Sequence, residues 1–205
     1  MSDLGLQRVG PTLGGIGTAA PFRADVTGAQ SVADAHGRYA EATRRQKVYG
    51  AASQAATTWS VALNTTHTGF VVYNPVASGV NLEILQASFA LSVAPVAIAH
   101  VGLFSGFLAA GIATHTTALT PFNTYVGGAV GYGRADAAAT LVGTPIWMMP
   151  MMSGFTAGAL FATTPAIVDV GGSIVVPPGG YCGIGALTAV IGFAGMFWEE
   201  VPIIT

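Results

Sequence analysis

Charged residues are scarce in this 205-residue chain, and most of them lie in its first quarter. Asp, Glu, Lys and Arg make up 8% of the residues, against 52% hydrophobic residues, whereas a soluble domain is typically about a quarter charged. Six of the seven basic residues precede Val48. The later charged residues are Glu83, Arg134, Asp136, Asp169, Glu199 and Glu200. A surface with so little charge lacks the usual protection against association, so we expect most of it to be covered by lipid or by other protein subunits.

Cysteine is almost absent as well. The single Cys182 excludes an internal disulfide framework and is compatible with assembly in a reducing cytosol. The formal net charge of −2 indicates neither a nucleic-acid binder nor a mimic of a polyanion. The first fifteen residues have no apolar run behind a basic start, so we expect no secretory signal.

Uncharged apolar stretches at 84–113, 141–161 and 182–198 raise the possibility of membrane spans, and the first is long enough to cross a bilayer. Its apolar side chains, however, recur at every second position, which is the pattern of a half-buried strand: they are Leu85, Ala87, Phe89, Leu91 and Val93. Prolines interrupt the stretches, and only one basic residue follows Lys47 to set a topology. We therefore expect strands and no membrane insertion.

The N-terminal region predicts an arm followed by one helix. Residues 1–28 are rich in Gly, Pro and Thr and provide no core of their own, so we expect an extended arm that lies on a partner. Residues 31–47 are typical of a helix, with Ser31 as N-cap and Gly50 as the stop. Acid–base pairs four residues apart support that helix; they are Asp34 with Arg38 and Glu41 with Arg45.

Two groups of residues are candidates for contacts with a partner. The basic cluster at the end of the helix permits three interpretations: helix-end electrostatics, anchoring to an acidic protein surface, or contact with DNA, for which it offers few phosphate contacts. The Met-rich segment at 147–152 permits two interpretations: adaptable packing, or an inter-subunit contact. The candidate partner-binding residues are Arg8, Arg23, Arg38, Tyr39, Arg44, Arg45, Lys47, Trp147, Met148 and Met149.

After about residue 57 the chain consists of short apolar runs separated by turn signals such as Asn74-Pro75 and Pro177-Pro178. This spacing favours a sandwich or jelly roll over alternating strands and helices. We therefore predict a mainly β protein: an N-terminal arm and one short helix over residues 1–56, then a β-sandwich, jelly-roll-like domain over residues 57–205.

Residues capable of catalysis or metal binding do not form a recognisable motif. The histidines, His36, His67, His100 and His115, lack metal-ligand spacing. Adjacent Glu199 and Glu200 should face opposite sides of a strand, one of them toward a buried partner such as an arginine of the arm. Cys182 lies in an apolar run and is expected to be an inert packing residue. We predict no enzyme, no metal site and no cofactor.

Four phrases, in this order along the chain, resemble a family of virion structural proteins of tailed bacteriophages. They are DAHGRY-EA (34–42), YNPVASGVNLEIL (73–85), IVVPPGG (174–180) and WEEVP (198–202). The resemblance implies an oligomeric β-sandwich that cements or decorates the head. The Met-rich segment at 147–152 and the Arg44-Arg45 pair depart from the family pattern, so contact details do not transfer.

The resemblance and the shortage of charge together lead to one expectation. The protein should be a head cement or decoration protein, found in the virion after assembly in the host cytoplasm. We expect it to be a homo-oligomer, and specifically a trimer. Its partner should be the major capsid protein or another virion protein, without nucleic acid or membrane. The alternative is a tail, fibre-adaptor or receptor-binding module, for which the visible cluster is Tyr125, Tyr132, Arg134 and Asp136.

Overall fold

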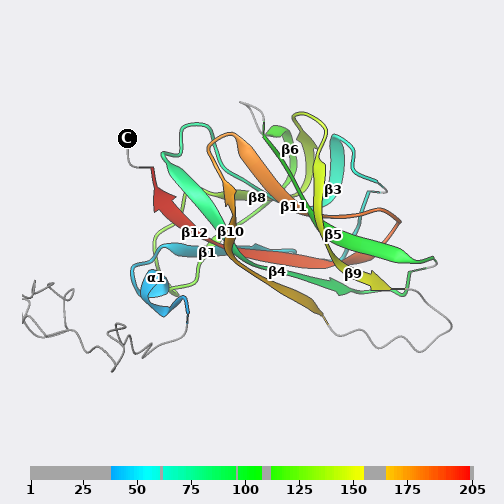
Figure 1. The fold of residues 1–205 in the computed structure, drawn as a ribbon, viewed down its shortest axis with the longest axis horizontal. Coiled ribbons are helices and arrows are strands. Elements are labelled where there is room, and N and C mark those ends of the chain that lie inside the picture. Colours follow the sequence, from blue (N-terminus) through cyan, green and yellow to red (C-terminus); the bar gives the residue numbers. More distant parts are fainter. Residues whose placement is uncertain (1–37, 61, 96, 108–111, 155–164, 204–205) are drawn as a thin grey trace, which may run out of the picture. The chain divides into compact units, whose positions relative to one another are not determined.

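The computed structural model describes residues 38–60, 62–95, 97–107, 112–154 and 165–203 (Figure 1). The chain divides into two compact units, Met1–Arg38 and Tyr39–Thr205. The predicted arm, with Arg8 and Arg23, and the predicted helix start at Ser31 lie outside the described residues. The second unit includes the helix Ala40–Arg44 and the strand Val48–Ala52, both of which lie within the predicted N-terminal region 1–56.

The described residues form one helix and twelve strands. These are α1 (Ala40–Arg44), β1 (Val48–Ala52), β2 (Thr57–Thr58), β3 (Thr66–Tyr73), β4 (Val80–Leu91), β5 (Ala99–Phe107), β6 (Ile112–Leu119), β7 (Phe122–Asn123), β8 (Arg134–Leu141), β9 (Ile146–Gly154), β10 (Ala166–Val176), β11 (Gly180–Ala186) and β12 (Ile191–Pro202). The prediction of a mainly β protein with one short helix is therefore confirmed for this part of the chain.

The strands form two antiparallel sheets (Figure 1). Sheet A has the order β10-β4-β12-β1-β7, with β2 also paired to β12, and sheet B has the order β6-β8-β3-β11-β5-β9. If β2, β6, β7 and β8 are left aside, the eight remaining strands pair as first–eighth–third–sixth and second–seventh–fourth–fifth in chain order. That is the order of a jelly roll, which confirms the predicted sandwich class.

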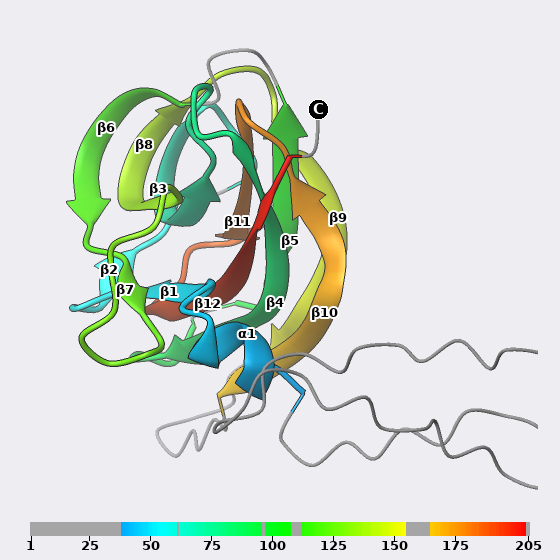
Figure 2. The same ribbon diagram turned by 90° about the vertical axis from the view of Figure 1, so that its left-hand side faces the viewer.

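The segment 112–141, which joins β5 to β9, extends one edge of each sheet. Its strand β7 pairs with β1 of sheet A, and β8 pairs with β3 of sheet B, followed by β6 outside it. Figure 2 shows β6, β7 and β8 together on one side, with β9 and β10 on the other. One side of the sandwich therefore carries the additional strands β6, β7 and β8, whereas the other side ends at β9 and β10.

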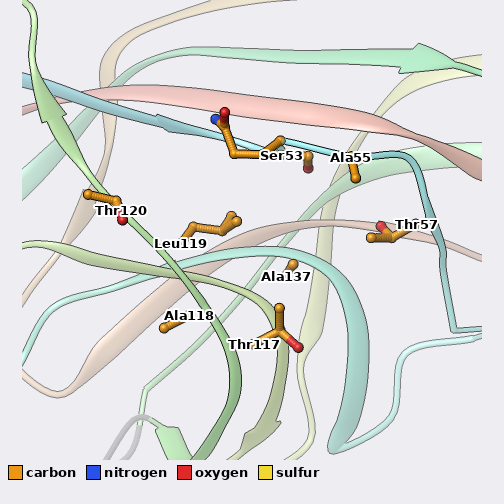
Figure 3. Close-up of a pocket in the computed structure, with 9 residues that line it drawn as sticks. Ser53, Ala55, Thr57, Thr117, Ala118, Leu119, Thr120 and Ala137 are labelled. Atoms are coloured by element: carbon orange, nitrogen blue, oxygen red, sulfur yellow. The ribbon is translucent and has the colours of Figure 1, made fainter.

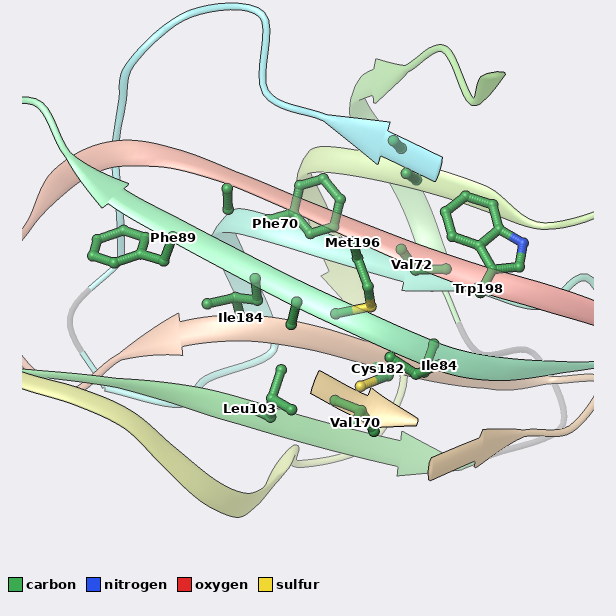
Figure 4. Packing of buried hydrophobic residues seen from close by; sticks show 14 of the residues in the cluster. Phe70, Val72, Ile84, Phe89, Leu103, Val170, Cys182, Ile184, Met196 and Trp198 are labelled. Atoms are coloured by element: carbon green, nitrogen blue, oxygen red, sulfur yellow. The ribbon is translucent and has the colours of Figure 1, made fainter. Parts of the chain in front are cut away.

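The core lies between the sheets and is built from alternate positions of their strands (Figure 4). Sheet A contributes Ile84, Met196 and Trp198, and sheet B contributes Val72 and Ile184, each at most 1% exposed. Cys182 belongs to the same cluster, and burial raises the pKa of its thiol to about 12, so it stays protonated at neutral pH. Its predicted role as a packing residue is confirmed.

The predicted helix end at Gly50 is wrong. The helix α1 ends at Arg44, and Gly50 lies inside β1 opposite Phe197 of β12. The chain leaves the helix through Gln46, whose φ of 59° is left-handed. The Gln46 amide donates to the Thr43 carbonyl and the Lys47 amide to the Ala42 carbonyl, which is the Schellman pattern normally built on glycine.

The glycine pair Gly171-Gly172 is a typical turn signal in a sequence, but here it lies inside a strand. The strand β10 runs without interruption from Ala166 to Val176, and its pairing with β4 shifts between Asp169 and Ile174. Both glycines have positive φ, so they form a bulge within one strand instead of a turn between two.

Candidate protein-contact surfaces

The helix α1 lies on the outer face of sheet A. The Tyr39 hydroxyl donates to Asp169 Oδ1 of β10 at 3.0 Å, and Tyr39, Thr43, Gln86 and Phe197 line a small cavity of about 180 Å³. The predicted pair of Glu41 and Arg45 is present at 2.8 Å, but both side chains are about two-thirds exposed, so it adds little stability.

Basic side chains of the helix region reach the protein surface. The residues Arg38, Arg44, Arg45 and Lys47 are all exposed. The same face also carries carboxylates, because Glu83 of β4 and Glu199 of β12 lie directly opposite each other. Burial and the neighbouring Glu83 raise the pKa of Glu199, against the opposing effect of Arg45. The face therefore mixes both signs of charge.

Glu199 and Glu200 face opposite sides of β12, as predicted. Glu200 points into the protein, is 4% exposed, and accepts the Gly133 amide at 2.8 Å through Oε1. Its partner in the structure is thus a backbone N–H group of the β7–β8 loop. The arginines of the predicted arm lie outside the described residues.

The Met-rich segment forms most of β9, one of the two edge strands of sheet B. Trp147 packs over Gly102 of β5, on the outer face that also carries Phe104. Met151 and Met152 pack against the core, whereas Met148 and Met149 are 44% and 36% exposed. The helix residues and Trp147 therefore lie on the outer faces of different sheets and do not form one site.

A polar cluster occupies the outer face of sheet B near β6. His115 Nδ1 and Asp136 Oδ2 are 2.8 Å apart, and the Asp136 side chain is 1% exposed. Burial raises the pKa of Asp136, and the hydrogen bond with His115 opposes that shift. The Tyr73 ring stacks on His115 with ring centroids 4.7 Å apart. Burial raises the pKa of the Tyr73 hydroxyl to about 12.

Among the described residues, this cluster lacks a nucleophile hydrogen-bonded to its histidine. A histidine held by a carboxylate serves as a general base when its other ring nitrogen meets a hydroxyl or thiol, and in the described part of the chain no such group is hydrogen-bonded to His115. Likewise, no group of three or more His, Cys, Asp or Glu side chains among the described residues is arranged to hold a metal ion.

The tyrosines and charged residues of the receptor-binding alternative are placed differently. Tyr125 and Tyr132 are 47% and 55% exposed. The Arg134 guanidinium donates to the carbonyls of Gly131 and Gly133 at 2.7 and 3.1 Å, and Asp136 is buried with His115. The two charged groups therefore stabilise the protein's own structure, and only the tyrosines face outward.

A cavity of about 580 Å³ opens between the β1–β2 connection and strands β6 and β8 (Figure 3). Its lining consists of small or uncharged side chains: Ser53, Gln54, Ala55, Thr57, Thr117, Ala118, Leu119, Thr120 and Ala137. None of these side chains titrates near neutral pH, so the lining offers no general acid or base.

Exposed apolar side chains are a surface feature whose position cannot be read from the sequence. Val126 and Val130 of the β7–β8 loop are 94% and 73% exposed, and Ile146 and Phe107 at the β9 side are 69% and 63% exposed. Exposed apolar patches mark contact sites for proteins or membranes. In the sequence, the loop surface is indicated only by the absence of charged residues from 120 to 133. That absence does not identify which valines are exposed.

His67 should make the stability of the fold dependent on pH. Its side chain is 3% exposed, and burial lowers its pKa from 6.5 to about 4, only partly opposed by a backbone hydrogen bond with Phe70. Between pH 6.5 and pH 4, His67 is therefore protonated in the unfolded chain and neutral in the folded protein. We expect full stability above pH 6.5 and a loss of about 3 kcal/mol as the pH falls toward 4.

Chemical unfolding of the wild type and His67→Gln across this pH range tests that expectation. The variant should lose about 3 kcal/mol less than the wild type between pH 7 and pH 4, because glutamine does not titrate. The carboxylates are common to both proteins, so their contribution cancels in the comparison. Equal losses in the two proteins would show that His67 is not responsible.

Comparison with known proteins identifies no relative, since no protein-family model, curated protein or solved structure matches the chain. Among the described residues, no helix has the length and apolar character needed to cross a membrane.

Proposed function

We propose that this chain is a structural protein of a bacteriophage virion, which binds the outside of the head shell and cements or decorates it. The observation that carries the proposal is the surface of the sandwich, where large apolar side chains are exposed and charged ones are few. A monomer with such a surface would associate in solution. Fixed protein neighbours on a shell would cover it, and the many weak contacts of a lattice would add together.

Three further observations support the proposal. The jelly-roll order of strands is common among viral capsid domains, although it occurs in lectins and cupins too, so by itself it supports only the architecture. The cavity between β1–β2 and β6–β8 has an unreactive lining. The exposed basic side chains of the helix region could meet an acidic surface on the major capsid protein or another virion protein.

Binding to purified head shells tests this function. Shells of the phage that encodes the chain, prepared without it, should bind the full-length protein saturably and in a fixed ratio to the capsid subunits. The decorated shells should also resist heating better. Shells that already carry the protein are the matched control and should take up none. Failure of the empty shells to bind would contradict the proposal.

The receptor-binding or fibre-adaptor module is the second candidate, and the exposed Tyr125 and Tyr132 favour it. Aromatic rings on an ordered loop can stack on sugars or pack on a host protein. A glycan-array signal that Tyr132→Ala abolishes would support this candidate. Location of the protein in the tail, and not in the head, would do the same.

A further inference from the structure

Two uncharged apolar surfaces lie on the described unit, one protruding and one hollow. The protruding surface is the β7–β8 loop, residues 124–132 (loop 124–132), where Tyr125, Val126, Val130 and Tyr132 are between 47% and 94% exposed. The hollow surface, here called the edge groove, has a volume of about 410 Å³. Its lining includes Phe107, Ile146, Met148 and Val175.

Loop 124–132 is held by hydrogen bonds within the loop and with the adjoining Asn123. Asn123 Oδ1 accepts the Tyr125 amide at 2.9 Å, and its Nδ2 donates to the carbonyls of Ala129 and Gln46, both at 3.1 Å. The Gly128 amide donates to the Tyr125 carbonyl at 2.7 Å. A loop that is already ordered loses little entropy when it binds, so its apolar side chains are well placed to enter a partner.

The edge groove exposes side chains at positions that face the core. Ile146 of β9 pairs with Ser105 of β5, which pairs with the buried Cys182 of β11, and Phe107 lies two residues further along β5 on the same face. These inward-facing side chains are nevertheless 69% and 63% exposed. The sandwich therefore remains open at the edge formed by β9 and β10, where a partner could complete the core.

The topology places the two surfaces on opposite sides of the sandwich. Loop 124–132 follows β7, which ends sheet A at one edge, and the edge groove lies along β9 and β10, which end the two sheets at the other (Figure 2). We propose that the chain binds a second copy of itself head to tail, with loop 124–132 of one subunit in the edge groove of the next.

Shape, charge and area support a second copy as the occupant. One chain carries both the protruding loop and the hollow groove. Neither surface includes a charged side chain that would need a counterion. The exposed side chains of loop 124–132 present on the order of a few hundred Å² of mostly apolar surface, a substantial part of the roughly 800 Å² that each partner buries in a typical interface. A contact between different patches closes into a ring when its rotation permits.

This contact does not depend on the virion assignment, and it can be tested on the isolated full-length protein. Val126→Asp/Val130→Asp (the loop variant) and Phe107→Ser/Ile146→Asp (the groove variant) change only exposed side chains. Both should keep the wild-type circular-dichroism spectrum. By light scattering, the wild type should be a closed oligomer and each variant a monomer. Val76→Asp, at a 58% exposed position outside both surfaces, is the matched control and should remain oligomeric.

Mixing the two variants provides the decisive measurement. The intact groove of the loop variant can accept the intact loop of the groove variant, so an equimolar mixture should form a heterodimer and no larger ring. A contact between like surfaces would predict no such rescue. A monomeric wild type, variants that keep the wild-type mass, or a mixture that stays monomeric would each overturn the proposal.

Discussion

Deleting residues 1–37 should weaken binding to head shells by about a hundredfold or more, because an arm that engages the shell adds a second attachment to that of the sandwich. The composition of residues 1–28 provides no core, and the buried hydrophobic residues of the described part begin at Val48. The truncated chain keeps Tyr39 and its hydrogen bond to Asp169. It should therefore fold and assemble like the full-length protein.

Co-sedimentation with empty shells, titrated with truncated and full-length protein, measures the effect. Circular dichroism and light scattering on the same samples check that the truncated chain is folded and oligomeric. Full-length Arg8→Ala/Arg23→Ala separates the two arginines from the rest of the arm and should give an intermediate loss. Unchanged affinity of the truncated chain would contradict the arm hypothesis and leave shell binding to the sandwich alone.

The strand pattern predicted the fold class because burial alternates wherever one face of a strand packs on the core. In β4, for example, Ala87 and Phe89 are buried and their neighbours Gln86 and Ser88 are partly exposed, which is the alternation visible in the sequence. The pair Pro177-Pro178 follows the last residue of β10, as expected of residues that cannot donate to a ladder.

Strands that are rich in alanine were not predicted. The strand β8 has the sequence RADAAATL, and alanine and aspartate are depleted in strands. Its position depends on pairing with β3 and β6, which are far from it in the sequence or separated from it by the β7–β8 loop. Local preference gives no sign of such pairing, so the extension of sheet B by β6 and β8 could not be read from this sequence.

The candidate surfaces could be predicted only as residue types. The sequence indicated that apolar side chains would be exposed somewhere, because charge is missing, but period and composition do not distinguish Val126, which is 94% exposed, from Val71, which is fully buried. The basic helix residues and Trp147 were grouped as partner contacts. They lie on different sheets, because the strand order of the sandwich decides which faces share a surface.

The other large effect that we expect is a strong destabilisation of the sandwich by Gly183→Ala. Gly183 lies in the middle of β11, between Val71 of β3 and Phe104 of β5. An added methyl carbon would lie 2.4 Å from Phe104 Cζ and 2.6 Å from the Phe70 backbone oxygen. The ring cannot easily yield, because it is fully buried between His67 and Tyr181. The carbonyl belongs to the neighbouring strand and cannot move without breaking the pairing.

We expect Gly183→Ala to cost about 3 kcal/mol or more, a large share of the stability of one domain. Gly195→Ala is the matched control, because its added carbon would meet nothing closer than 3.3 Å, and it should stay within about 1 kcal/mol of the wild type. Urea unfolding measures both. In a double-mutant cycle with Phe104→Ala, which removes the obstructing ring, the combined loss should be smaller than the sum of the single losses. Additive losses would show that the Phe104 ring is not the reason why β11 requires glycine at position 183.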